Sequence, residues 1–166
     1  MSGDSSFRIR SMAEADLDRL VEIAAGVDHA PQWPRRAYEA VLDSSFPQRV
    51  ALVAEDPETG GLAGFVVASL VPPEAELESI AVSAAYQRRG VARRLFGFLA
   101  GELGQCQVRE VLLEVRESNQ SALAFYTSLG FVEEGRRYGY YDEPVEDAIL
   151  MRLKLCKPPE QGQIGV

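Results

Sequence analysis

Apolar residues recur along the chain at the spacings of helices and strands. In residues 14–25 and 90–103 they fall three and four positions apart, which predicts two amphipathic helices. Two further helices are predicted from residues that favour a helix end. Residues 34–42 open on a proline, and residues 119–129 lie between a capping Ser or Asn and a glycine.

The remaining apolar runs predict strands. They are residues 7–11, 49–55, 62–71, 76–83, 110–116, 131–138 and 148–155. A turn rich in proline and glycine at residues 56–61 joins the second and third of these as a hairpin. The order β-α-α-β-β-β-α-β-α-β-β predicts an α/β protein with a mixed sheet flanked by helices. We expect one domain over residues 7–155, with flexible termini at residues 1–6 and 156–166.

The composition narrows the class of function. The chain has 166 residues and a net charge of −8, which disfavours nucleic acid as a ligand. Its longest apolar run, residues 61–71, is too short to span a bilayer, and the N-terminus lacks an apolar signal segment. We therefore expect no membrane contact and a cytoplasmic location. Cys106 and Cys156 form no disulfide framework, and with His29 as the single histidine no metal site is expected.

The most informative stretch follows strand 76–83, where a short turn opens the next helix. It consists of Gln87, Arg88, Arg89, Gly90, Val91 and Ala92. Backbone N–H groups at a helix start lack partners and can bind a pyrophosphate. The glycine and the small alanine would let phosphate oxygens approach, and the two arginines add positive charge. The alternative is a solvated arginine pair beside a glycine at a helix start.

Three polar residues further along the chain are candidates for chemistry. Glu114 shares one face of its strand with Arg116. A carboxylate in an apolar strand is costly unless it is paired or functional, so an ion pair with Arg116 is the structural alternative. Asn119 and Tyr126 are seven residues apart and share one helix face. For Tyr126 the alternative is a core tyrosine with a satisfied hydroxyl.

Taken together, in this order and spacing, these features resemble the GNAT family of N-acetyltransferases, which use acetyl-CoA. The resemblance covers about residues 7–155. It is carried by Ile80-Ala81-Val82, the Q-x-x-G-x-A turn at 87–92, Ser118-Asn119, Phe125-Tyr126 and Leu129-Gly130-Phe131. It implies a single domain with a central mixed, mostly antiparallel sheet. It also implies that the fourth strand and its neighbour splay apart, with the thioester of acetyl-CoA in the gap.

The resemblance assigns the coenzyme contacts residue by residue. The backbone of Ile80, Ala81 and Val82 would pair with the pantetheine arm, and the Val82 amide would point at the thioester carbonyl. The pyrophosphate would lie on the amides of residues 87–92. Asn119 would hold the coenzyme arm.

The resemblance also implies how protons move. Glu114 would accept a proton from the attacking amine, and Tyr126 would give one to the departing thiolate. Attack would be direct, in a ternary complex, because neither cysteine lies in this constellation. Glu76 and Glu78 remain alternatives for the base, since other branches of the family place it on that strand.

Within the family, residues 112–131 (LLEVRESNQSALAFYTSLGF) resemble the branch that acetylates the N-terminal alanine of a bacterial ribosomal protein. The chain departs from this branch by a shorter loop between Tyr141 and Glu146, and by one extra residue between Arg137 and Tyr140. We expect the acceptor to be the α-amino group of a protein, such as a ribosomal protein. A small-molecule amine, a lysine side chain and a non-catalytic acyl-CoA sensor are the alternatives.

Aromatic and acidic residues near the C-terminal end favour the protein acceptor. Tyr138, Tyr140 and Tyr141 could form a wall for a peptide backbone, although ordinary strand aromatics would give the same pattern. Glu146 and Asp147 could attract a basic chain.

Overall fold

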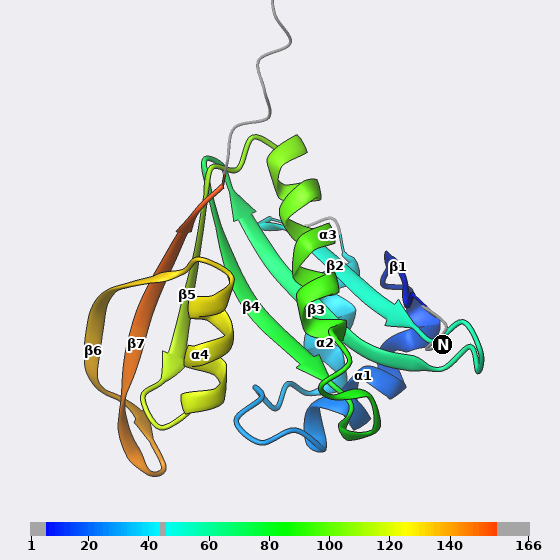
Figure 1. Cartoon of the computed structure of the whole chain (residues 1–166), viewed down its shortest axis with the longest axis horizontal. Coiled ribbons are helices and arrows are strands. Elements are labelled where there is room, and N and C mark those ends of the chain that lie inside the picture. The colour runs from blue at the N-terminus through cyan, green and yellow to red at the C-terminus, as the bar shows by residue number, and fades with distance from the viewer. Residues whose placement is uncertain (1–5, 44–45, 156–166) are drawn as a thin grey trace, which may run out of the picture.

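The computed structural model describes residues 6–43 and 46–155, which form a seven-stranded sheet flanked by helices (Figure 1). The strand order is β1-β2-β3-β4-β5-β7-β6, and every neighbouring pair is antiparallel except β4 with β5. The strands are β1 (Arg8–Ser11), β2 (Gln48–Glu55), β3 (Leu62–Val71), β4 (Glu74–Val82), β5 (Glu110–Arg116), β6 (Val132–Asp142) and β7 (Val145–Lys154). The predicted mixed, mostly antiparallel sheet is confirmed. Of the predicted flexible termini, residues 1–6 and 156–166, all but Ser6 lie outside the described residues.

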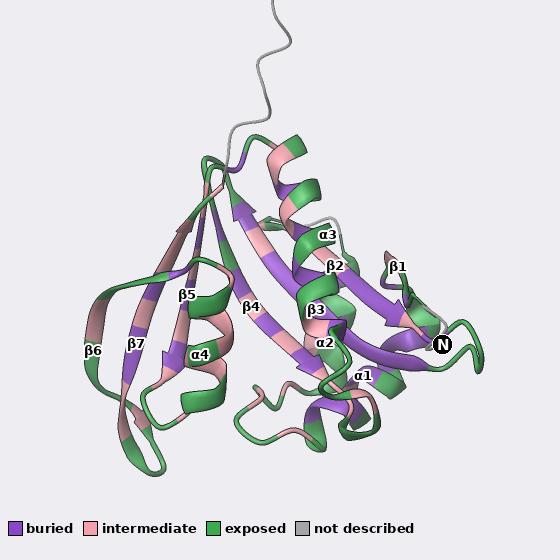
Figure 2. Cartoon of the chain, in the orientation of Figure 1, coloured by how far each residue is buried: buried purple, intermediate pink, exposed green. Residues whose placement is uncertain are grey.

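Helices pack on both faces of this sheet. They are α1 (Leu17–Ala25), α2 (Arg35–Leu42), α3 (Val91–Gln105) and α4 (Gln120–Ser128). The helices α3 and α4 cover one face and α1 and α2 cover the other, so that there are two apolar cores (Figure 1). Because β3 lies between these layers, its residues 62–68 are all buried (Figure 2). In the described residues no helix is both long enough and apolar enough to cross a membrane.

The helices begin and end close to the residues from which their ends were predicted. Pro34 is the N-cap of α2 rather than a residue of its first turn. The Asn119 side chain caps α4 by accepting a hydrogen bond from the Ala122 amide at 3.2 Å. After α4, Gly130 adopts a φ of +103°, a conformation that L side chains rarely adopt, and the chain turns into β6.

The last hairpin is longer than the sequence predicts. β6 continues to Asp142 and β7 begins at Val145, so Tyr141 pairs with Glu146 and Asp142 with Val145. The register shifts between Arg137 and Tyr141. This irregularity and the exposed, mixed side chains of the hairpin conceal the alternation by which a strand is recognised.

The two parallel strands separate soon after they begin. β4 pairs with β5 only at residues 74–76, opposite residues 110–112. Residues 77–82 of β4 have no partner on β5, so a gap opens in the middle of the sheet. This is the splay that the resemblance implies.

Candidate active site

The exposed backbone of β4 faces the gap between β4 and β5. The Ser83 amide donates to Ala63 O of β3 at 2.8 Å, so the backbone groups of Ser83 point toward β3. In an antiparallel pair this direction alternates, and Ala81 therefore faces β3 while Ile80 and Val82 face the gap. The Val82 N–H thus has the orientation that its predicted role requires.

The turn after β4 has two residues in the left-handed conformation. These are Arg88, with a φ of +63°, and Gly90, the N-cap of α3, with a φ of +77°. Left-handed residues in such turns bring successive N–H groups to one side, which makes a concavity for anions. A Cβ on Gly90 would meet no heavy atom within 4 Å, so its conformation and not crowding within the chain favours glycine. The Gln87 side chain donates to Val82 O at 3.2 Å, which ties the turn to the gap.

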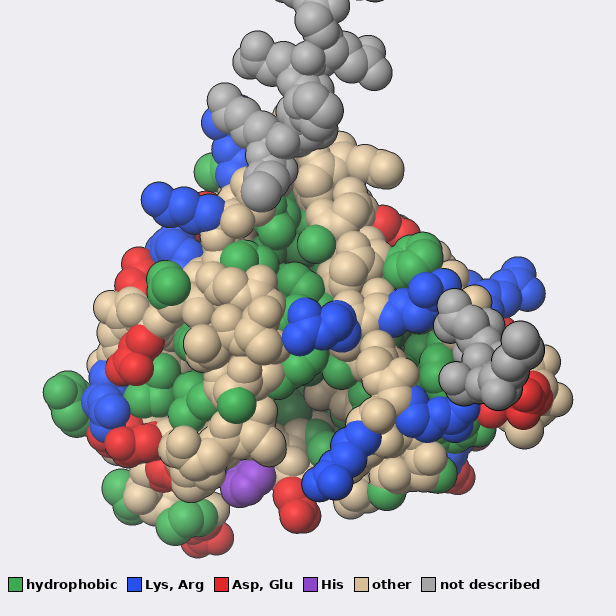
Figure 3. All heavy atoms as spheres, in the orientation of Figure 1, with side chains coloured by type: hydrophobic (Ala, Val, Ile, Leu, Met, Phe, Trp, Pro, Cys, Tyr) green, Lys and Arg blue, Asp and Glu red, His purple; other side chains and the backbone are tan. Residues whose placement is uncertain are grey.

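The other residues of the turn differ in exposure. Val91, the first residue of α3, is buried in the core. Ala92 is half-buried, and Arg88 and Arg89 are exposed. Figure 3 shows Lys and Arg side chains gathered around the N-terminal end of α3. A locally positive surface therefore surrounds this turn, although the protein as a whole is acidic.

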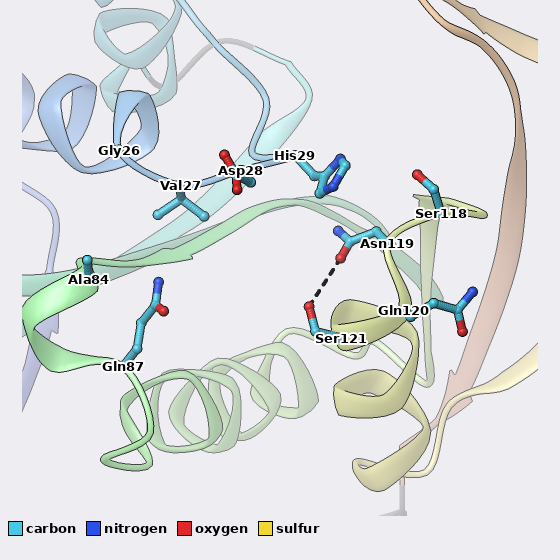
Figure 4. Close-up of a pocket in the computed structure, with 10 residues that line it drawn as sticks. All are labelled: Gly26, Val27, Asp28, His29, Ala84, Gln87, Ser118, Asn119, Gln120 and Ser121. Carbon is cyan, nitrogen blue, oxygen red and sulfur yellow. Dashed lines mark hydrogen bonds between the residues drawn. The ribbon is translucent and has the colours of Figure 1, made fainter.

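A cavity of about 570 Å³ lies next to this turn (Figure 4). It is lined by Gly26, Val27, Asp28, His29, Ala84, Gln87, Ser118, Asn119, Gln120 and Ser121. It therefore brings together Gln87 and Asn119, both predicted coenzyme contacts. Because Asn119 Oδ1 accepts from the Ala122 amide, Nδ2 is the atom that remains for a ligand. Nothing in the sequence assigns residues 26–29 to this cavity, because the loop between α1 and α2 carries no motif and is about ninety positions from α4.

Glu114 projects from the face of β5 opposite α4. Val111, Leu113 and Val115 point into the core with α3 and α4, so Glu114 faces the other side. Its Oε1 lies 3.3 Å from Arg137 Nε.

The alternative prediction for Glu114, an ion pair with Arg116, is wrong. Arg116 instead pairs with Glu146 at 3.4 Å and stacks over the Tyr141 ring, 4.0 Å from its centroid. Arg137 also lies 5.4 Å from the centroid of the Tyr140 ring, and the negative charge of Glu114 raises the pKa of Tyr140.

The two carboxylates on β4 differ in their surroundings. Glu78 is paired with Arg49, with Nε 2.9 Å from Oε2. Glu76 has no ion-pair partner among the described residues. Partial desolvation raises its pKa above the usual range, and the charges of Glu114 and Glu78 raise it further. Glu76 therefore remains a candidate base beside Glu114.

Tyr126 lies on the opposite side of the sheet from Glu114. It packs with α3 and α4, and its ring centroid is 5.5 Å from that of Phe125 and 5.7 Å from that of Phe131. Burial raises the pKa of Tyr126 to about 12, so the phenol is protonated at neutral pH. None of the hydrogen bonds within residues 6–43 and 46–155 involves its hydroxyl.

The acidic pair on β7 already has partners inside the protein. Glu146 accepts hydrogen bonds from Ser118 and pairs with Arg116, and these contacts lower its pKa. Asp147 accepts from the Gly139 amide at 2.8 Å and pairs with Arg136 at 3.1 Å, which lowers its pKa as well. These contacts weaken the expectation that the pair attracts a basic acceptor.

Comparison with known proteins identifies relatives along most of the chain. The model of the acetyltransferase (GNAT) family matches residues 16–131. The ribosomal protein bS18-alanine N-acetyltransferase of Escherichia coli is 43% identical over 149 residues, which cover 89% of this chain and 97% of that protein. A Mycobacterium leprae protein is 37% identical over 146 residues, which are 87% of this chain but 40% of that longer protein. The crystal structure of the ribosomal-protein-S18-alanine N-acetyltransferase from Escherichia coli matches with a TM-score of 0.79 and 32% identity, over 93% of this chain and 97% of that one.

Proposed function

Because this chain belongs to the acetyltransferase (GNAT) family, its reaction is the transfer of an acetyl group from acetyl-CoA to a primary amine, and we propose that the acceptor is the N-terminal α-amino group of a protein. The observation that carries this proposal is the 43% identity to the bS18-alanine N-acetyltransferase, which extends over 97% of that enzyme. A ribosomal protein that begins with alanine is accordingly the first acceptor to test.

The surface beside Glu114 supports a peptide acceptor. Tyr138 and Tyr140 on β6 are exposed, at 83% and 48%. Arg137 directly precedes Tyr138 in the sequence, pairs with Glu114, and lies 5.4 Å from the centroid of the Tyr140 ring. Exposed aromatic rings around a charged group offer a contact surface for a peptide backbone near the proton acceptor.

The coenzyme contacts that we propose use the backbone more than side chains. The gap-facing groups of Ile80 and Val82 would pair with the pantetheine arm, as an added strand pairs with a sheet edge. The Val82 N–H would stabilise the charge that develops on the thioester oxygen. The amides of residues 87–92 would bind the pyrophosphate, and Asn119 Nδ2 would donate to the arm.

The two proton-transfer groups approach the acetyl group from opposite faces of the sheet. An α-amino group has a pKa of about 7.7–8.0, so at neutral pH it must lose a proton before it attacks. Glu114 would accept this proton on the open face of β5, directly or through a water. Tyr126 would supply a proton to the departing sulfur on the side of α4.

A turnover assay with acetyl-CoA against a panel of amines tests the acceptor. The panel holds peptides that begin with Ala, Ser, Met or Gly, an N-terminally blocked peptide with one internal lysine, and small amines such as a polyamine. We expect turnover of free N-termini, with alanine preferred, and none of the blocked peptide. Acetylation of the internal lysine or of a small amine alone would overturn the proposed acceptor and leave the reaction class intact.

A further inference from the structure

Tyr86 links residues 87–92, the proposed pyrophosphate site, to the hairpin turn between β2 and β3. Tyr86 is the last residue of a 3₁₀ turn, Ala84–Tyr86, and directly precedes Gln87. Its hydroxyl donates to Asp56 Oδ2 at 2.8 Å, although Asp56 is thirty positions earlier in the chain. The Tyr86 ring also packs edge-on against Phe7, with centroids 5.7 Å apart.

Asp56 is itself held rigidly in the turn between β2 and β3. Its Oδ1 accepts from the Glu58 amide at 2.9 Å, and its own amide donates to Gly61 O at 2.8 Å. Its carbonyl accepts from the Gly60 amide at 2.8 Å. The amide of Glu58 and the hydroxyl of Tyr86 lower the pKa of this buried carboxyl, so it is ionised at neutral pH. The carboxylate therefore offers the Tyr86 hydroxyl a fixed and charged acceptor.

The same tyrosine orients an arginine of the turn. The Arg89 guanidinium lies 5.1 Å from the centroid of the Phe7 ring and 5.4 Å from that of Tyr86. Cation–π contacts at these distances hold the guanidinium in place. Phe7 is fixed in turn, because Arg94 Nε of α3 donates to its carbonyl at 2.7 Å.

A carboxylate close to a phosphate site repels the phosphates. Asp56 would therefore not favour the coenzyme by attracting it, and its hydrogen bond to Tyr86 suggests a different role. We propose that Asp56 and Tyr86 are positioning residues, which hold residues 87–92 and the Arg89 guanidinium in the conformation that receives the coenzyme phosphates. This inference rests on the proposed placement of the pyrophosphate. Its consequence is that the Asp56–Tyr86 hydrogen bond favours ligands with phosphates and leaves the pantetheine site unchanged.

Tyr86→Phe tests the inference, because it removes the hydroxyl and keeps the ring beneath Arg89. The matched control is Tyr38→Phe, since the buried Tyr38 hydroxyl has no hydrogen-bond partner among the described residues. Binding of acetyl-CoA is measured by calorimetry, and binding of acetylpantetheine, which lacks the phosphates, by NMR titration. Neither measurement needs an acceptor. We expect Tyr86→Phe to weaken acetyl-CoA at least about threefold, as loss of a hydrogen bond to a charged acceptor predicts, and to leave acetylpantetheine unchanged.

Each other outcome has a defined meaning. Equal weakening of both ligands, or no weakening of acetyl-CoA, would overturn the positioning role. Gly90→Val, measured alongside, separates this failure from that of the phosphate site. If Gly90→Val weakens acetyl-CoA and Tyr86→Phe does not, only the inference fails. If neither variant weakens acetyl-CoA, the phosphates do not lie on residues 87–92. Asp56→Asn removes the charge, but its side-chain amide can still bond to the Tyr86 oxygen. An affinity for acetyl-CoA equal to that of the unaltered protein would show that the hydrogen bond matters rather than the charge.

Discussion

Glu114 lies on the open face of β5 and has Arg137 as its ion-pair partner. If Glu114 takes the proton of the amine, Glu114→Gln should lower kcat/KM by about 10²-fold at neutral pH. The defect should shrink toward alkaline pH, because the α-amino group loses its proton near pH 7.7–8.0 without help. Steady-state kinetics of both proteins from neutral to alkaline pH check this. The variant should bind acetyl-CoA within a few fold of the unaltered protein.

Glu76→Gln is the matched control, because Glu76 is the second candidate base and has a raised pKa. It should retain most of the activity. An inactive Glu76→Gln beside an active Glu114→Gln would place the base on β4. The kinship to the ribosomal-protein enzymes would then not extend to the proton acceptor.

Tyr126 should act as an acid over the whole working range of pH. Burial raises its pKa to about 12, so the phenol keeps its proton far above neutrality. Tyr126→Phe should therefore lower kcat by about 10²-fold, and alkaline pH should not restore it, in contrast to Glu114→Gln. The pH profile of kcat checks this. A variant with unchanged kcat would make Tyr126 a core tyrosine without a catalytic role.

Glu114 shows how much of a single residue's environment can be predicted from the sequence. The alternation of its strand places Glu114 and Arg116 on one face, and the structure agrees. Their partners are decided by strands that come later in the chain. Since β5 pairs with β7 and β7 with β6, Arg137 comes to Glu114 and Glu146 to Arg116. No local pattern in the sequence carries that information.

Among the elements, the turn into α3 offers a test of conformation. Gly90 has a φ of +77°, which strains a β-branched residue and which asparagine tolerates. Gly90→Val should weaken acetyl-CoA at least tenfold, or about 1.4 kcal/mol, through this strain and through its bulk beside the phosphates. Gly90→Asn should weaken acetyl-CoA less. Calorimetry measures both affinities, and an unchanged affinity of Gly90→Val would show that the phosphates do not bind at this turn.

The elements themselves were largely predictable, whereas their arrangement was not. Periodicity and end signals place the strands and helices within a few residues of their observed bounds. The order of the last three strands, β5-β7-β6, depends on long-range pairing that periodicity does not encode. The splay of β4 and β5 was expected only from the resemblance to a known family. The cavity beside α4 needs the loop between α1 and α2, which no spacing rule brings there.

At the scale of the whole molecule, the proposed coenzyme and acceptor residues lie on different faces of the sheet. On one face, α3, α4 and the turn before α3 bring together the residues proposed for the coenzyme, including Tyr126. On the other, α1 and α2 pack on β2, β3 and β4 (Figure 1). Glu114 of β5 points to this same side of the sheet, because its neighbours Leu113 and Val115 point into the core with α3 and α4. The amine and the thioester would thus meet through the gap in the sheet, each reaching it from its own side.

The net charge of −8 gives this arrangement a long-range preference for cationic acceptors. Because Glu146 and Asp147 have internal partners, the attraction should come from the field of the whole protein and not from that pair. kcat/KM for an Ala-peptide with basic residues should therefore fall as salt is raised from 0.01 to 0.1 M, where the Debye length shortens from about 30 to about 10 Å. An Ala-peptide without charged side chains is the control and should change little. Glu146→Gln should lower the melting temperature, through loss of its contacts with Arg116 and Ser118, and leave the salt dependence in place. Equal losses for both peptides would instead attribute the effect of salt to the coenzyme phosphates, and a flat profile would attribute acceptor binding to the aromatic surface of β6.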